Sequence, residues 1–246
     1  MSTDAHWPQG VDRIILDQTD STMAEARRRA ETLAAPTWIM ARRQTAAQGR
    51  RGRPWVEPTG NLAATLVYRP TGTLDQLALR SFVAALALYD ALARVVAPDR
   101  LSLKWPNDVL LDEAKVAGIL LEAIGGPDAP ALAVGIGVNL AQAPTPGQVE
   151  PGAVAPIGLG AGVGPDDLLC DLAAAYDRHE RAIGDFGFEQ IRKLWLSRAA
   201  RLGQPMIART GAETIEGVFE TIDAAGHLVL HTPTGARVIP AADVYF

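Results

Sequence analysis

The seven residues from Gly49 to Trp55 combine residue types that bind anions. They hold three arginines, two glycines and a tryptophan. Arginine offers a rigid fork of N–H donors that matches phosphate oxygens, and glycine lets backbone N–H groups approach an anion closely. The surrounding segment 42–60 is rich in Arg, Gly and Pro, and loops of that length are usually functional. The pattern predicts a phosphate-binding loop, with a solvated basic loop as the alternative.

Two further segments bring charged groups to the ends of predicted strands. Residues 104–108, Lys-Trp-Pro-Asn-Asp, place a cation, an amide and a carboxylate where a strand meets a turn, a common position for ligand sites. Lys115 opens an apolar strand, and Gly118 leaves room for a ligand to approach the backbone. Taken singly, each segment is explained as well by a structural turn or a surface lysine. Residues 135–139, Gly-Ile-Gly-Val-Asn, lack the third glycine and the helix of a dinucleotide fingerprint, which excludes a Rossmann site.

The elements that must position these residues form two regions. Up to residue 201 the hydrophobic pattern predicts a helix starting at residues 21–22, further helices over 74–96, 165–183 and 188–200, and strands over 37–43, 62–68, 101–105, 109–111, 116–123 and 131–140. The last of these strands is nearly all apolar and is therefore predicted to be central. From residue 206 short β-branched runs alternate with glycine turns, as in a small β-barrel. We therefore predict two domains, residues 1–201 and 202–246.

Composition limits the function classes. The chain has 246 residues, a globular balance of 48% hydrophobic and 21% charged residues, and a net charge of −5. This charge gives no general attraction to nucleic acid, so phosphate chemistry must depend on a local basic cluster. The single cysteine, Cys170, excludes an intrachain disulfide and a cysteine metal cluster, and its apolar neighbours predict an inert thiol in a helix. No apolar run suits a signal peptide or a membrane span, so a cytoplasmic location is expected.

Together, the order and spacing of these motifs resemble the biotin–protein ligase family, from about residue 20 to the C-terminus. Ala47 and Gln48 stand where the family usually has Gly-Arg, and Met23 replaces the usual Asn, while Arg50 and Arg53 keep their places. The matching segments are residues 20–22 with the family's Asp-Ser-Thr-Asn, 44–55 with its Gly-Arg-Gly-Arg-x-Gly-Arg-x-Trp loop, 104–108 with its Lys-Trp-Pro-Asn-Asp, 115–120 with its Lys-x-x-Gly-Ile-Leu, and 135–139 with its Gly-Ile-Gly-x-Asn.

The resemblance implies an α/β (α+β) fold. A mixed-sheet catalytic domain, related to class II aminoacyl-tRNA synthetases, would precede a small SH3-like β-barrel. It implies a ligase that uses ATP and biotin to form biotinyl-5′-AMP and then biotinylates a lysine of a biotin carboxyl carrier domain, such as that of acetyl-CoA carboxylase. Mg²⁺ is expected to be held mainly through substrate phosphates, without metal-ligating residues of its own. Bifunctional members carry a DNA-binding winged helix before the first motif, where only about twenty residues stand here, so no DNA binding is expected. A homodimer is left open.

The resemblance also implies roles for particular residues. Gly60, Leu62 and Ile119 would wall the aliphatic chain of biotin. The catalytic residues would be Arg50, Lys115 and Asp108; the biotin-binding residues Ser21, Thr22, Gln44, Gly49, Arg50, Lys115 and Gly118; and the ATP- and adenylate-binding residues Arg50, Arg53, Trp55, Lys104, Asn107, Lys115 and Asn139.

Two other functions compete with this interpretation. A lipoate or octanoate ligase or transferase shares the fold and a lysine at the position of Lys115, whereas the arginine-rich loop and residues 104–108 favour biotin. A non-catalytic biotin-sensing repressor is disfavoured by the acidic charge. We further expect the loop 46–57 to be mobile without ligand, because its arginines repel one another.

Overall fold

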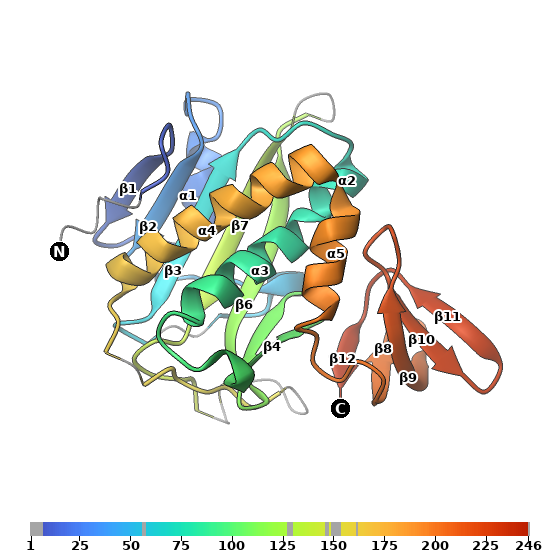
Figure 1. The fold of residues 1–246 in the computed structure, drawn as a ribbon. Coiled ribbons are helices and arrows are strands. Elements are labelled where there is room, and N and C mark those ends of the chain that lie inside the picture. The colour runs from blue at the N-terminus through green and yellow to red at the C-terminus, as the bar shows by residue number, and fades with distance from the viewer. Residues whose placement is uncertain are drawn as a thin grey trace.

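The computed structural model describes residues 7–55, 58–126, 130–145, 148, 154–160 and 162–245. Its larger part is built on a seven-stranded mixed sheet (Figure 1), with the strand order β1-β2-β3-β7-β6-β5-β4. Only β1 and β2 pair in parallel. The predicted central strand, β7, lies in the middle of this order. The strands are β1 Asp12–Leu16, β2 Thr37–Ala41, β3 Leu62–Tyr68, β4 Leu101–Lys104, β5 Asp108–Leu111, β6 Ala114–Ile124 and β7 Ala131–Val138.

Helices cover both faces of this sheet. In Figure 1, α3 and α4 run across one face, while α1 packs against β3 and β7 on the other. Ser21 caps α1, since its hydroxyl accepts a hydrogen bond from the Ala24 N–H at 3.0 Å. Cys170 lies buried on α4, as predicted. The helices are α1 Thr22–Arg29, α2 Leu74–Ala78, α3 Arg80–Leu92, α4 Pro165–Phe186 and α5 Phe188–Leu196, with short 3₁₀ turns η2 Arg50–Gly52 and η3 Pro98–Arg100.

The single helix predicted over 74–96 is wrong, because the chain forms α2 and α3 with a break at Leu79. The guanidinium of Arg80 donates to the Gln76 carbonyl at 3.0 Å, the acceptor that the Arg80 N–H would use in a continuous helix. The same guanidinium is buried and pairs with Glu180 of α4 at 3.0 Å. This ion pair joins the two helices across the sheet face.

A second, antiparallel sheet forms the C-terminal SH3-like barrel, and the predicted fold class is confirmed. Its strand order is β11-β10-β9-β8-β12, and Gly226 and Gly235 occupy positive φ angles in its turns. The strands are β8 Pro205–Arg209, β9 Thr214–Ile222, β10 Leu228–Thr232, β11 Gly235–Ile239 and β12 Asp243–Tyr245. Within the described residues, no helix is both long and apolar enough to cross a membrane.

The barrel packs directly on the helical layer and the end of β4. The buried indole of Trp105 donates to the Gly226 carbonyl at 3.0 Å. A Cβ atom at Gly226 would lie 2.7 Å from the ring of Phe82 in α3, so the close approach requires glycine. Arg192 of α5 donates to the Ile222 carbonyl at 2.9 Å. Buried side chains of both sheets consequently form one continuous hydrophobic core.

Candidate active site

A cavity of about 510 Å³ opens where β6, β7, the start of α1, the loop 47–55 and β12 meet. It is lined by every residue named above as catalytic, biotin-binding or ATP- and adenylate-binding. Ile119 also lines it, whereas Leu62, expected to wall the biotin chain, is wholly buried in the core, and Gly60 lies outside the lining. The residues brought together are Ser21, Thr22, Gln44, Gly49, Arg50, Arg53, Trp55, Lys104, Asn107, Asp108, Lys115, Gly118 and Asn139.

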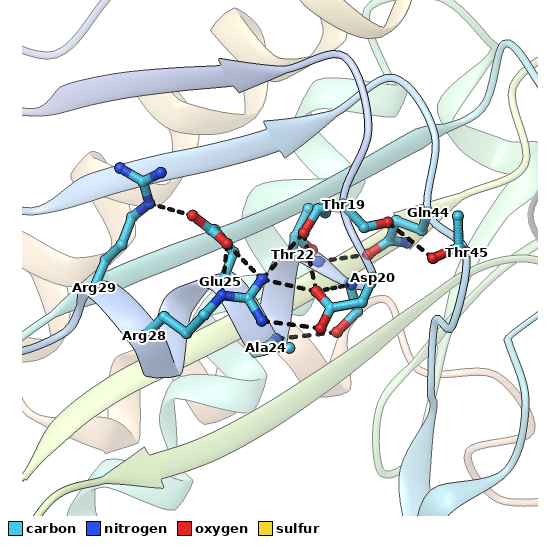
Figure 2. A network of polar contacts seen from close by, with 10 residues as sticks. Thr19, Asp20, Thr22, Ala24, Glu25, Arg28, Arg29, Gln44 and Thr45 are labelled. Carbon is cyan, nitrogen blue, oxygen red and sulfur yellow. Dashed lines mark hydrogen bonds and ion pairs between the residues drawn. The ribbon is translucent and has the colours of Figure 1, made fainter.

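One end of the cavity is polar and neutral. The Gln44 side-chain carbonyl accepts a hydrogen bond from the Thr22 N–H at 2.7 Å, as Figure 2 shows. The Thr65 hydroxyl donates to the Thr22 hydroxyl at 2.8 Å, and both threonines are buried. A hydroxyl that accepts one hydrogen bond can still donate another, so this end offers donors and acceptors to a polar ligand group.

A network on the outer side of α1 fixes this polar end (Figure 2). The Asp20 carboxylate accepts the Ser21 N–H at 2.7 Å and pairs with Arg28 at 2.8 Å. The hydrogen bond from Arg28, and after it the one from the Ser21 N–H, hold the pKa of Asp20 well below its usual range. Arg28 also contacts Glu25, which in turn contacts Arg29. Asp20 therefore anchors the turn that presents residues 21 and 22, and does not itself line the cavity.

The floor of the cavity is formed by three glycines of β6 and β7, which we call the glycine floor (Gly118, Gly135 and Gly137). Gly118 and Gly137 are cross-strand partners. A Cβ atom would lie 2.8 Å from the Trp55 indole at Gly137, and 3.2 Å from it at Gly118. At Gly135 a Cβ would lie 2.8 Å from the end of Met23. Glycine is therefore needed here because the side chains of Trp55 and Met23 lie directly on the backbone.

The centre of the cavity holds a buried carboxylate between two lysines. Asp108 lies 2.7 Å from the Lys115 ammonium and 3.7 Å from that of Lys104. Burial alone would raise the pKa of Asp108, but the two lysines outweigh it, so this pKa lies below its ordinary value. For Lys104 burial is the stronger effect and lowers its pKa, although Asp108 opposes the shift. The Lys115 ammonium also lies 5.5 Å from the centre of the Trp55 ring.

Because of Asp108, the free energy of unfolding is expected to decrease more steeply with falling pH than it would without this carboxylate. Its folded-state pKa lies below the unfolded value of about 3.9. The stability from its ion pairs is therefore fully present above that pH, and it is lost as the pH falls through the folded-state pKa. Urea unfolding at about pH 7 and about pH 3.5 measures this loss, which should be larger for the wild type than for Asp108→Asn. Equal losses would exclude Asp108 as the source.

The segment we call the arginine loop (residues 47–55) is folded tightly over the cavity. The Gly49 N–H donates to the Arg53 carbonyl at 2.8 Å, and the Trp55 N–H to the Ala47 carbonyl at 2.9 Å. Arg50 is half-buried and reaches inward to the Asn107 side-chain carbonyl at 3.3 Å. Burial lowers its pKa, while nearby carboxylates oppose the shift.

The other two arginines of the loop contact a residue that sequence reasoning missed. Arg51 and Arg53 lie 2.6 Å and 3.1 Å from the carboxylate of Asp243 on β12. Arg53, expected at the triphosphate, thus lines the cavity while contacting the barrel. Val244 and Tyr245 line the cavity as well. No local motif marks these residues, because only the packing of the barrel brings them to the site.

Residues 15–139 match the model of the biotin/lipoate A/B protein ligase family, and residues 202–246 match that of the biotin protein ligase C terminal domain. The first match covers just over half of the chain. The chain therefore belongs to the biotin/lipoate A/B protein ligase family.

Individual relatives point to one branch of this family. The chain is 54% identical to a biotin–acetyl-CoA-carboxylase ligase of Paracoccus denitrificans, over 94% of this chain and 99% of the relative. It is 31% identical to a Mycobacterium tuberculosis ligase of the same description, over 94% and 87% of the two chains. A solved biotin protein ligase of Aquifex aeolicus, in complex with biotin and ATP, superposes with a TM-score of 0.78 at 26% identity, covering 95% of this chain and 98% of that one.

Proposed function

We propose that this chain is an ATP-dependent biotin ligase that forms biotinyl-5′-AMP and then biotinylates a lysine of a carboxylase carrier domain. The observation that carries the proposal is the change in polarity from one end of the cavity to its centre. A neutral hydrogen-bonding end at Thr22 and Gln44 leads over the glycine floor to a cationic centre at Lys104 and Lys115. Biotin has the same sequence of groups: a ureido head, an aliphatic chain and a carboxylate.

In the first step the biotin carboxylate attacks the α-phosphorus of ATP. A new O–P bond forms, the bond to the β-phosphate breaks, and pyrophosphate leaves. Because two anions must meet, the enzyme has to neutralise both and hold them in line. Arg50 and Lys115 are suited to this task, since Arg50 points inward from the loop and Lys115 lies at the cavity centre beside Trp55. Lys104 adds positive charge on the other side of Asp108.

In the second step the carrier lysine attacks the acyl carbon of the mixed anhydride: a C–N bond forms, the C–O bond to AMP breaks, and the proton of the amine passes to water. The attacking amine must shed a proton to become nucleophilic. Asp108 has a lowered pKa and therefore accepts a proton weakly. We accordingly assign Asp108 to orienting the lysines and the incoming amine, rather than to the role of a strong general base.

The nucleotide would lie toward Asn139. This side chain is 2% exposed and lines the cavity, and its carbonyl oxygen has no hydrogen-bond partner among the described residues. A buried acceptor without a partner is costly, so a ligand donor is expected there. The exocyclic amine of adenine meets this requirement, with Trp55 close by to cover the adenylate.

Mg²⁺ would enter with ATP. The two carboxylates that line the cavity, Asp108 and Asp243, are each paired with lysine or arginine side chains, and the described residues contain no cluster of three or more His, Cys, Asp or Glu side chains able to hold a metal ion. An ion held mainly by phosphate oxygens and water fits such a site, and it would neutralise charge on the leaving pyrophosphate.

Isotope exchange between pyrophosphate and ATP tests the proposed function. Exchange should require biotin but no carrier protein, because the adenylate forms reversibly before the carrier lysine reacts. Lipoate is the control, since its dithiolane ring has no N–H or carbonyl group to form hydrogen bonds with the polar end of the cavity at Thr22 and Gln44. Lipoate-dependent exchange exceeding that with biotin would contradict the proposal and favour a lipoate ligase. A protein that binds biotin without exchange would favour a sensor.

A further inference from the structure

A carboxylate of the C-terminal barrel lies among the cations of the arginine loop. Asp243, on β12, is about one-fifth exposed and accepts hydrogen bonds from both Arg51 and Arg53. Its register partner on β8 is Arg209, but that guanidinium stacks on the ring of Tyr245 at 4.4 Å. Asp243 therefore faces the catalytic domain, although it belongs to a strand of the barrel.

The arginine side chains of the loop point in two directions. Arg50 points into the cavity toward Asn107, while Arg51 and Arg53 point to Asp243. Arg51 has a φ of 56°, a left-handed conformation that a non-glycine residue adopts at some cost. This conformation, with the contact between the Gly49 N–H and the Arg53 carbonyl, turns neighbouring side chains to opposite sides of the loop.

We propose that Asp243 is a positioning residue, which fastens the arginine loop over the cavity and so retains the adenylate between the two chemical steps. Three arginines in four positions repel one another, and a fixed carboxylate offsets this repulsion without occupying the ligand space. With Arg51 and Arg53 held by the barrel, Arg50 stays directed at Asn107 and Trp55 stays on the glycine floor. Part of this inference, the retention of adenylate, rests on the proposed function.

Limited trypsin digestion of the ligand-free protein tests the fastening without any activity. Trypsin can cut after Arg50 and Arg51, whereas Arg53 precedes Pro54. Cleavage after Arg50 should be about three- to tenfold faster in Asp243→Asn than in the wild type, since partly exposed ion pairs are individually weak. Asp243→Glu, which keeps the charge, should restore most of the protection.

The matched control is Glu213→Gln. It removes a carboxylate from the same barrel, but one that pairs with Arg237 and does not line the cavity. Cleavage in this variant should equal that of the wild type. If Asp243→Asn loses barrel stability in thermal unfolding, Arg51→Gln removes one of the ion pairs from the loop side and should still speed cleavage after Arg50. Equal cleavage rates in the wild type, Asp243→Asn and Arg51→Gln would overturn the proposal.

Release of the adenylate is the second measurement. Biotinyl-AMP bound to the protein is chased with excess unlabelled adenylate, and its dissociation should be about three- to tenfold faster in Asp243→Asn, with recovery in Asp243→Glu. Dissociation at the wild-type rate in Asp243→Asn would overturn the retention role. If the wild type formed no adenylate, the proposed function would fail, while the digestion of ligand-free protein would still test the fastening.

Discussion

Lys115→Ala is expected to lower the rate of biotin-dependent pyrophosphate exchange about 10²- to 10³-fold, as when a preorganised charge contact is removed. The Lys115 ammonium lies at the cavity centre, 2.7 Å from Asp108, where the carboxylate of biotin and the α-phosphate would meet. Without it, two anions must approach beside a buried carboxylate. Initial-rate measurements at saturating ATP and biotin provide the test.

The same substitution should also cost stability, contrary to what a lysine at the start of a strand suggests. It leaves the buried Asp108 with Lys104, at 3.7 Å, and the more distant Arg50 to balance its charge, a loss of about 1–3 kcal/mol in the free energy of unfolding. The double variant Lys115→Ala/Asp108→Asn removes this imbalance and should regain stability but not activity. Near-normal exchange by the folded double variant would remove Lys115 from the reaction.

Gly137→Val should reduce exchange about 10- to 100-fold, as expected for inserting a side chain into a filled space. The first added carbon would already lie 2.8 Å from the Trp55 indole. Because Trp55 belongs to a loop, it can move aside. The substitution should therefore lower activity more than it lowers the stability of the sheet. Michaelis constants for biotin and ATP, measured together with thermal unfolding, separate these effects.

Gly126→Val is the matched control, because a Cβ atom at Gly126 meets no atom within 4 Å and its φ angle is not positive. This variant should retain wild-type exchange. Full activity of Gly137→Val would mean that Trp55 does not need its place on the glycine floor.

The sequence could predict the parts of the site that lie in contiguous motifs. Lys104 and Asp108 flank one turn, and Lys115 and Gly118 lie on one strand, so local spacing was enough to propose these segments as parts of a ligand site. The apolar run of 131–140 predicted a central strand, because a strand buried on both faces has no polar alternation, and β7 is central. The resemblance to a family supplied their roles, which composition and spacing would not have distinguished from structural ones.

The remaining features depend on tertiary contacts that leave no local signal. Asp243 is an ordinary acidic residue near the end of the sequence until the packing of the barrel brings it to Arg51. The break at Leu79 lies beside an arginine that pairs with a distant helix. The mobility expected for the loop 46–57 stays a prediction, and that expectation did not include the carboxylate that the barrel places beside the arginines. The strand β1, short and at a sheet edge, was not predicted at all.

The contact of Gly226 with Trp105 and Phe82 has a thermodynamic consequence for the whole molecule. Separating the barrel from the helices would expose these two aromatic rings and break the hydrogen bond to the Trp105 indole, so neither part can unfold without destabilising the other. We therefore expect the two sheets to unfold together. A ligand that binds only the native cavity then stabilises the distant hairpin of β9 and β10 by mass action as well, although it touches neither strand.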